Sequence, residues 1–197
     1  MVVVEASGPS DTQLVRQAIL GNTGAFDVLV DRYHRSLFSL AYRMLGNTDD
    51  AADAVQEAFV KAFRALREFQ PDRPLRPWLY KICANVAIDL GRARSKAPDP
   101  LEEHDYAISD GQPAPEEIAI AKDRDRQVHA AVARLPEKYR QIVVLRHFQH
   151  MEVNEIADVM DAPEGTVKSW LFRARAMLRR ELACLQNNPI PTEELAK

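Results

Sequence analysis

The chain has 197 residues, of which 46% are hydrophobic and 28% charged, and its 26 Lys+Arg against 29 Asp+Glu leave a net charge of -3. This composition is typical of a folded globular protein of one or two small domains and excludes a mainly disordered chain. The sequence has only seven glycines among many Ala, Leu, Glu and Arg residues, which predicts an all-α fold.

The cysteines and the N-terminus bear on the cellular compartment. Cys83 and Cys184 lie far apart in the sequence, without the paired spacing of a disulfide framework or a zinc site, so a reducing compartment is expected. The opening MVVVEASGPS has no basic leader, and no stretch approaches the roughly 18 apolar residues of a membrane span. We expect a cytoplasmic protein with no membrane insertion.

Two helices are predicted near the start of the chain. Ser10 and Gln13 have the spacing of a capping box, which predicts a helix over residues 11–20. Apolar residues at three- and four-residue intervals predict a second helix over residues 25–45, ending at Gly46. The buried face expected for this second helix consists of Phe26, Leu29, Tyr33, Leu37, Leu40 and Met44.

A third and a fourth helix follow. Thr48 is the expected N-cap of a helix over residues 49–66. After a proline-bounded loop at 69–77, Pro77 is the expected first residue of a helix that continues over 78–94, because proline suits that position. The buried faces expected for these helices are Ala51, Val55, Ala58, Phe59, Ala62 and Leu66, and then Leu79, Ile82, Cys83, Val86 and Leu90.

Charged residues are separated into blocks along the chain. Residues 71–96 hold six basic and two acidic residues, residues 97–125 hold two and nine, and residues 166–180 hold five and none. The acidic block is rich in proline and has no helical period, so it is predicted to be a flexible linker that leaves the parts on either side mobile. The expected organisation is a disordered N-terminus at 1–10, a four-helix domain at 11–96, the linker at 97–117, a second helical domain at 118–185 and a tail at 186–197.

The second domain contains the pattern of a helix-turn-helix over residues 153–172. The small residue Ala157 lies inside the first helix, Asp161 stands at a tight turn, Pro163 is expected to start the second helix, and Val167 is expected to pack back against the first. Asp at the turn fits because it adopts the left-handed conformation with less strain than most residues.

The segment 166–180 divides cleanly on a helical wheel. A solvated surface helix usually interleaves Glu with Lys, whereas this stretch has no acid and exposes a phenylalanine among its cations, which favours an anionic partner. A helix of this kind fits the major groove of duplex DNA. The apolar side is predicted to hold Val167, Trp170, Leu171, Ala174, Met177 and Leu178, and the cationic side Lys168, Ser169, Phe172, Arg173, Arg175, Arg179 and Arg180.

Two features of the first domain leave alternatives open. Outward positions of the third helix form an acidic stripe with an exposed Val60, which is either solvated surface or a protein contact. In the fourth helix, Asn85 is either a plain surface residue or a reader of an unstacked base, and Trp78 either packs in the core or stacks on a base.

Three stretches in this order resemble the signature blocks of the extracytoplasmic-function (ECF) sigma factors of bacterial RNA polymerase. They are NTDDAADAVQEAFVKAFRAL, RPWLYKICANVAID and LPEKYRQIVVLRHFQHMEVNEIADVMDAPEGTVKSWLFRARAMLRREL. The resemblance implies a promoter-melting helical domain, a linker and a helix-turn-helix domain, which together direct polymerase core to promoters. It also implies control by an anti-sigma protein in response to stress or an envelope signal, and no cofactor.

The resemblance assigns three sites. Core polymerase binding at the beta-prime clamp falls on Asp49, Asp50, Asp53, Gln56 and Glu57. Recognition of the minus-ten element falls on the 69–77 loop, with Arg73, Arg76, Trp78, Lys81 and Asn85. Recognition of the minus-thirty-five element falls on Gly165, Thr166, Lys168, Ser169, Phe172 and Arg173. The acidic linker is expected to lie in the basic cleft and RNA exit path of the polymerase as a nucleic-acid mimic.

Other classes of protein explain less of the sequence. A stand-alone helix-turn-helix regulator would account for residues 136–182 but leaves the acidic stripe and the Asn85 helix without a role. An enzyme is not expected, because there is no Gly-rich phosphate loop and no nucleophile elbow. His147 and His150 have a metal-like spacing but no suitable Cys or acidic companions, so no metal site is predicted.

Overall fold

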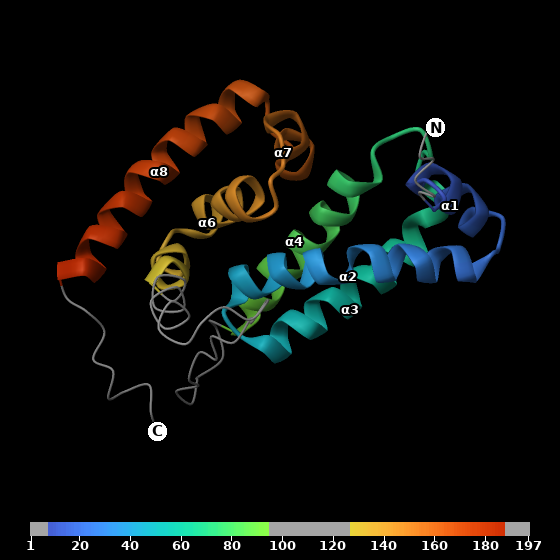
Figure 1. Ribbon diagram of the computed structural model, residues 1–197, viewed down its shortest axis with the longest axis horizontal. Coiled ribbons are helices and arrows are strands. Elements are labelled where there is room, and N and C mark those ends of the chain that lie inside the picture. The colour runs from blue at the N-terminus through green and yellow to red at the C-terminus, as the bar shows by residue number, and fades with distance from the viewer. Residues whose placement is uncertain (1–7, 95–126, 188–197) are drawn as a thin grey trace, which may run out of the picture.

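The computed structural model describes residues 8–94 and 127–187, and these residues form helices without a strand. The predicted N-terminal segment 1–10 lies mostly outside the described residues, and the predicted linker 97–117 lies wholly outside them. Two bundles of helices result (Figure 1). The first bundle contains α1 (Asp11–Ile19), α2 (Thr23–Leu45), α3 (Thr48–Ala65), the short η1 (Leu66–Glu68) and α4 (Leu75–Arg94). The second contains helical residues 127–133, α6 (Glu137–Val143), η2 (Val144–Phe148), α7 (Val153–Met160) and α8 (Glu164–Asn187).

Local capping signals set most helix boundaries. The capping box of Ser10 and Gln13 is present at the start of α1, and Gly46 ends α2 in the left-handed conformation with φ of 77°. The prediction that Thr48 caps α3 was wrong. Asn47 is the cap, and its side chain accepts a hydrogen bond from the Asp50 amide at 2.9 Å, so Thr48 becomes the first helical residue.

Two proline-based starts were also misplaced. Helix α4 begins at Leu75, so Pro77 is its third residue. Proline is tolerated there because amides of the first turn have no acceptor within the helix. Helix α8 begins at Glu164, and Pro163 precedes it with its carbonyl accepting hydrogen bonds from the amides of Thr166 and Val167.

The core of the first bundle follows the predicted helical faces. All the residues expected to be buried in the second and third helices are buried, and in α4 Leu79, Cys83 and Val86 are buried while Ile82 and Leu90 are partly buried. Their three- and four-residue spacing places them on one side of each helix. The amphipathic pattern alone therefore positions the outer faces of α3 and α4.

The helix-turn-helix is formed by α7, a turn at Asp161 and α8. Asp161 has φ of 47° and ψ of 49°, the left-handed conformation expected of it. Val167 is fully buried and packs in the core with Ile156 and Val159 of α7. Before α7, the chain makes a π-type turn in which the Gln149 amide donates to the Val144 carbonyl at 3.0 Å.

The two bundles lie in contact, whereas the linker pattern predicted independent movement. Helix α7 packs against α4 (Figure 1). The buried apolar residues of both bundles form one continuous cluster. Helix α8 lies on the far side of α6 and α7 from α4. This arrangement brings residues of the helix-turn-helix to the surface expected to read the minus-ten element.

Candidate nucleic-acid interface

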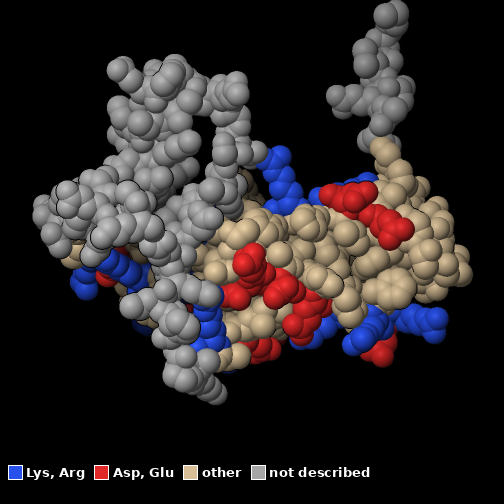
Figure 2. Space-filling view, turned by 90° about the horizontal axis from the view of Figure 1, so that it is seen from below, with Lys and Arg blue, Asp and Glu red and all other residues tan. Residues whose placement is uncertain are grey.

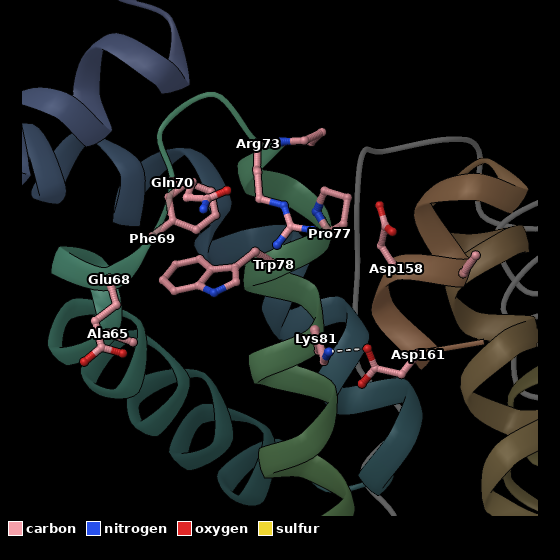
Figure 3. A pocket seen from close by; sticks show the side chains of 12 residues that line it. Ala65, Glu68, Phe69, Gln70, Arg73, Pro77, Trp78, Lys81, Asp158 and Asp161 are labelled. Carbon is pink, nitrogen blue, oxygen red and sulfur yellow. Dashed lines mark hydrogen bonds and ion pairs between the residues drawn. The ribbon is translucent and has the colours of Figure 1, made fainter. Parts of the chain in front are cut away.

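A pocket of about 580 Å³ lies where the 69–77 loop enters α4 (Figure 3). Phe69 and Trp78 form one wall, with ring centroids 4.6 Å apart and planes tilted by 41°. Trp78 is half-buried, so it both packs on Phe69 and presents part of its ring to the pocket. This one position of Trp78 therefore allows both core packing and stacking on a base.

The basic residues of this region differ in whether they face the solvent or pair with the second bundle. Arg73 is exposed and lines the pocket. Arg76 turns toward the second bundle, where it donates a hydrogen bond to the Gln149 carbonyl and lies 3.5 Å from a carboxylate oxygen of Glu155. The Lys81 ammonium lies 2.6 Å from Asp161, the residue at the helix-turn-helix turn (Figure 3).

Asn85 is exposed on α4, one turn beyond Lys81, but it does not line the pocket. The pocket instead includes Gln70 and Glu68, whose polar side chains come from the loop and from η1. Gln70 belongs to the 69–77 loop that the sequence assigned to this site, whereas Glu68 was not predicted, and its only signal is its position just before that loop.

The acidic stripe lies on the outer face of α3. Figure 2 shows acidic side chains gathered near the middle of the side of the molecule that carries this helix. Asp50 differs from the others because it pairs with Arg94 of α4 and is only partly exposed. Glu57 pairs with Lys61 at 2.8 Å, one turn along the same helix. The predicted core-binding residues that stay exposed are Asp49, Asp53, Gln56 and Glu57.

Apolar side chains adjoin this acidic stripe. Val60 is 42% exposed, as expected, and Phe63 is 49% exposed although its ring lies 5.0 Å from that of Phe26. Phe63 was missed in the sequence, although it follows Val60 by three positions and so continues the same face. Exposed apolar side chains beside acids are typical of a protein contact.

The cationic face of α8 is open. Lys168, Ser169 and Arg173 are exposed, and Phe172 is 77% exposed. Thr166 is partly exposed in the first turn, and at Gly165 an added Cβ would meet nothing within 4 Å.

Glu164, in the first turn of α8, lies 3.6 Å from the Lys168 ammonium. On the opposite side Trp170 is partly buried, with the Lys138 ammonium 4.1 Å from its ring. The predicted division of the helix into packing and cationic faces is confirmed.

Other chemistry-bearing residues do not assemble into a site. Within residues 8–94 and 127–187, no three His, Cys, Asp or Glu side chains come together as metal ligands. Burial, followed by the nearby Arg175 and Arg146, lowers the pKa of His147. Burial raises the pKa of the Cys83 thiol to about 12. In the same part of the chain, no helix is both long and apolar enough to cross a membrane.

Comparisons with known proteins agree with this arrangement. The family model for sigma-70 region 2 matches residues 29–97, and that for sigma-70 region 4 matches residues 125–178. The ECF RNA polymerase sigma factor SigW of Bacillus subtilis is 33% identical over 85% of this chain and 94% of its own length. The RNA polymerase sigma-H factor of Pseudomonas aeruginosa is 35% identical over 87% of this chain and 93% of its own.

Solved structures show the same fold. CnrH, solved with the cytosolic domain of CnrY, has a TM-score of 0.69 and 29% identity over 91% of this chain and 99% of its own. The sigma factor RpoE of Bartonella quintana, solved with the anti-sigma factor NepR, has a TM-score of 0.64 over 80% of this chain and 96% of its own, at 22% identity. The helical bundles, the helix-turn-helix and these matches along nearly the whole chain show that it belongs to the ECF sigma factors of bacterial RNA polymerase.

Proposed function

We propose that three separate surfaces carry out the sigma activity of this chain. The acidic and apolar face of α3 binds polymerase core, the pocket at the start of α4 receives a base of the minus-ten element, and the cationic face of α8 reads the minus-thirty-five element. The observation that carries this proposal is the presence, in one chain, of two surfaces of different design: a pocket with an aromatic wall and an exposed cationic helix face. The pocket is lined by an aromatic pair and by polar side chains, as recognition of an unstacked base requires. The α8 face is an exposed cationic helix, as a duplex groove requires.

The roles divide by residue. On α3, Asp49, Asp53, Gln56 and Glu57 contact core, while Asp50 supports the helix through Arg94. At the pocket, Trp78 offers its ring and Arg73 a cation for the backbone of the melted strand. Arg76, Lys81 and Asn85 extend this surface along α4.

On α8, Lys168, Ser169, Phe172 and Arg173 face the groove. The open space beside Gly165 lets the start of the helix approach a phosphate, and Thr166 follows it in the first turn.

An anti-sigma protein is the proposed regulator. Two structures with the same fold hold a second protein, the cytosolic domain of CnrY in one and the anti-sigma factor NepR in the other. The exposed apolar residues Val60 and Phe63 provide surface on the first bundle that such a partner and the polymerase would compete for.

Run-off transcription with purified core polymerase tests the proposal. Addition of this protein should give promoter-specific transcripts, and Asp53→Ala with Glu57→Ala should weaken core association and lower transcript yield. Asp89→Ala is the matched control, because Asp89 is an exposed acid on α4, away from the α3 stripe. Specific DNA binding without transcripts would instead identify a stand-alone regulator.

A further inference from the structure

Two of the three cations expected to meet minus-ten DNA are already bound by groups of the second bundle, whereas Arg73 stays exposed. Lys81 pairs with Asp161 at 2.6 Å, and Arg76 contacts both the Gln149 carbonyl and the Glu155 carboxylate. Oxygen atoms from the helix-turn-helix and from the turn before it thus occupy donors that would otherwise meet DNA phosphates or bases.

A buried glutamine makes this docking specific. Gln149 is only 6% exposed and reaches between α2 and α4. Its side-chain amide donates to the Ser39 hydroxyl at 3.3 Å, and its side-chain oxygen accepts from the Tyr80 hydroxyl at 3.1 Å. A buried amide with both of its ends satisfied by the other bundle specifies one arrangement, because any shift would leave buried polar groups unpaired.

Further contacts hold the bundles together away from the pocket. Arg92 makes two hydrogen bonds to the Glu137 carboxylate, at 3.1 and 2.7 Å. Arg140 donates to the Met44 carbonyl at 2.7 Å, at the C-terminal end of α2. The bundles also share one continuous apolar cluster, so the contact includes a hydrophobic component as well as ion pairs.

We infer that the free chain is closed, with α7 and the turn before it engaging Arg76 and Lys81 of the minus-ten surface as an internal competitor of DNA. This inference rests on the proposed role of that surface. The cationic face of α8 stays exposed in the closed chain, because it lies away from α4 (Figure 1). Closure therefore withholds Arg76 and Lys81 from melted minus-ten DNA but leaves duplex recognition by α8 available, and the bundles must separate before the whole minus-ten surface can bind.

Distance measurements between the bundles test closure. Spin labels are placed at native Cys184, which is exposed, and at Gln17→Cys on the exposed side of α1, since buried Cys83 is protected. The closed chain should give one narrow distance distribution. Glu137→Gln with Asp161→Asn should broaden it, because both remove contacts between bundles while Asn keeps the left-handed turn. Glu181→Gln is the matched control, since the Arg134–Glu181 pair lies within the second bundle.

A second experiment measures the affinity of the protein for a random-sequence pool of single-stranded DNA. Glu137→Gln should tighten binding by the full-length protein about two- to fivefold, because it weakens closure without touching the pocket. Glu181→Gln makes the same change in net charge and should have a smaller effect. Equal effects of the two variants, or an unchanged distance distribution in the opened variant, would overturn the inference.

A second pair of variants separates failure of the inference from failure of the proposed function. Arg73→Ala and Trp78→Ala, made in the Glu137→Gln background, should weaken single-strand binding if the pocket reads the minus-ten element. If they do so while Glu137→Gln alone changes nothing, closure is wrong and the site stands. If neither weakens binding, the site assignment itself is wrong, and the inference falls with it.

Discussion

Asp161 has two roles, one in the backbone conformation of a turn and one in an ion pair. It holds the left-handed conformation at the helix-turn-helix turn, and its carboxylate pairs with Lys81. The sequence predicts the turn, because few residue types adopt positive φ with little strain. The partner lies 80 positions away and is visible only in the folded chain.

We predict that Asp161→Ala lowers the free energy of unfolding by about 1 kcal/mol more than Asp161→Gly does. Both variants lose the pair with Lys81, so their difference isolates the backbone conformation. Urea denaturation of the two proteins measures this difference in the free energy of unfolding. Equal stabilities would mean that the turn relaxes out of the left-handed conformation.

The buried Cys83 thiol makes the free energy of unfolding depend on pH in the alkaline range. Burial raises the pKa of this thiol to about 12, whereas a cysteine thiol in the unfolded chain has a pKa of about 8.5. The folded state therefore keeps a proton that the unfolded state releases. The resulting stabilisation is fully present below the unfolded pKa and is lost as pH rises through the folded one.

We predict that wild-type protein loses more unfolding free energy between about pH 8.5 and pH 10 than Cys83→Ala does. Urea unfolding at the two pH values measures the loss. Cys184→Ala, at an exposed thiol, should keep the wild-type dependence. An identical slope for all three proteins would show that the Cys83 thiol is not protected in solution.

At the scale of elements, the two faces of α8 were predicted closely, because the helical spacing of its apolar and basic residues defines them. Val167, Leu171 and Ala174 are buried, while Lys168, Phe172 and Arg173 lie outward. The same reasoning placed the acidic face of α3. It misplaced the starts of α3, α4 and α8, because two adjacent capping residues or a tolerated first-turn proline shift a boundary at little energetic cost.

We predict that Lys168→Ala or Arg173→Ala weakens duplex binding to the minus-thirty-five element by about 1–3 kcal/mol where a base contact is lost. Arg134→Ala removes an exposed cation elsewhere in the second bundle and should change binding little. Fluorescence anisotropy with a promoter duplex measures all three. Equal losses would indicate a general charge effect instead of a reading face.

At the scale of the whole molecule, Arg140 links the bundles. It donates hydrogen bonds to the carbonyls of Met44, Ala133 and Leu135, at 2.7, 2.6 and 3.2 Å. Met44 and Ala133 lie at the ends of helices, where carbonyls lack partners within the helix, and Leu135 lies in the turn that follows Ala133. Burial lowers the pKa of its guanidinium.

We predict that Arg140→Ala lowers the free energy of unfolding by about 2–3 kcal/mol, because partly buried carbonyls lose a charged donor. Arg140→Lys should recover little of this, since one ammonium cannot replace the planar fork of donors. Chemical denaturation measures both. Full recovery by Lys would show that charge alone matters at this position.

The sequence by itself determined the all-α fold, the helical faces with their acidic and cationic stripes, and the helix-turn-helix. These features depend on spacing, capping and charge within short stretches, where each residue's neighbours are known from the chain. Only the tertiary structure decided which predicted contacts are available: Asp50 is tied to Arg94, and Arg76 and Lys81 are tied to the second bundle. Those pairs join residues 44 to 80 positions apart, so they exist only once burial of a shared apolar cluster has brought the two bundles together.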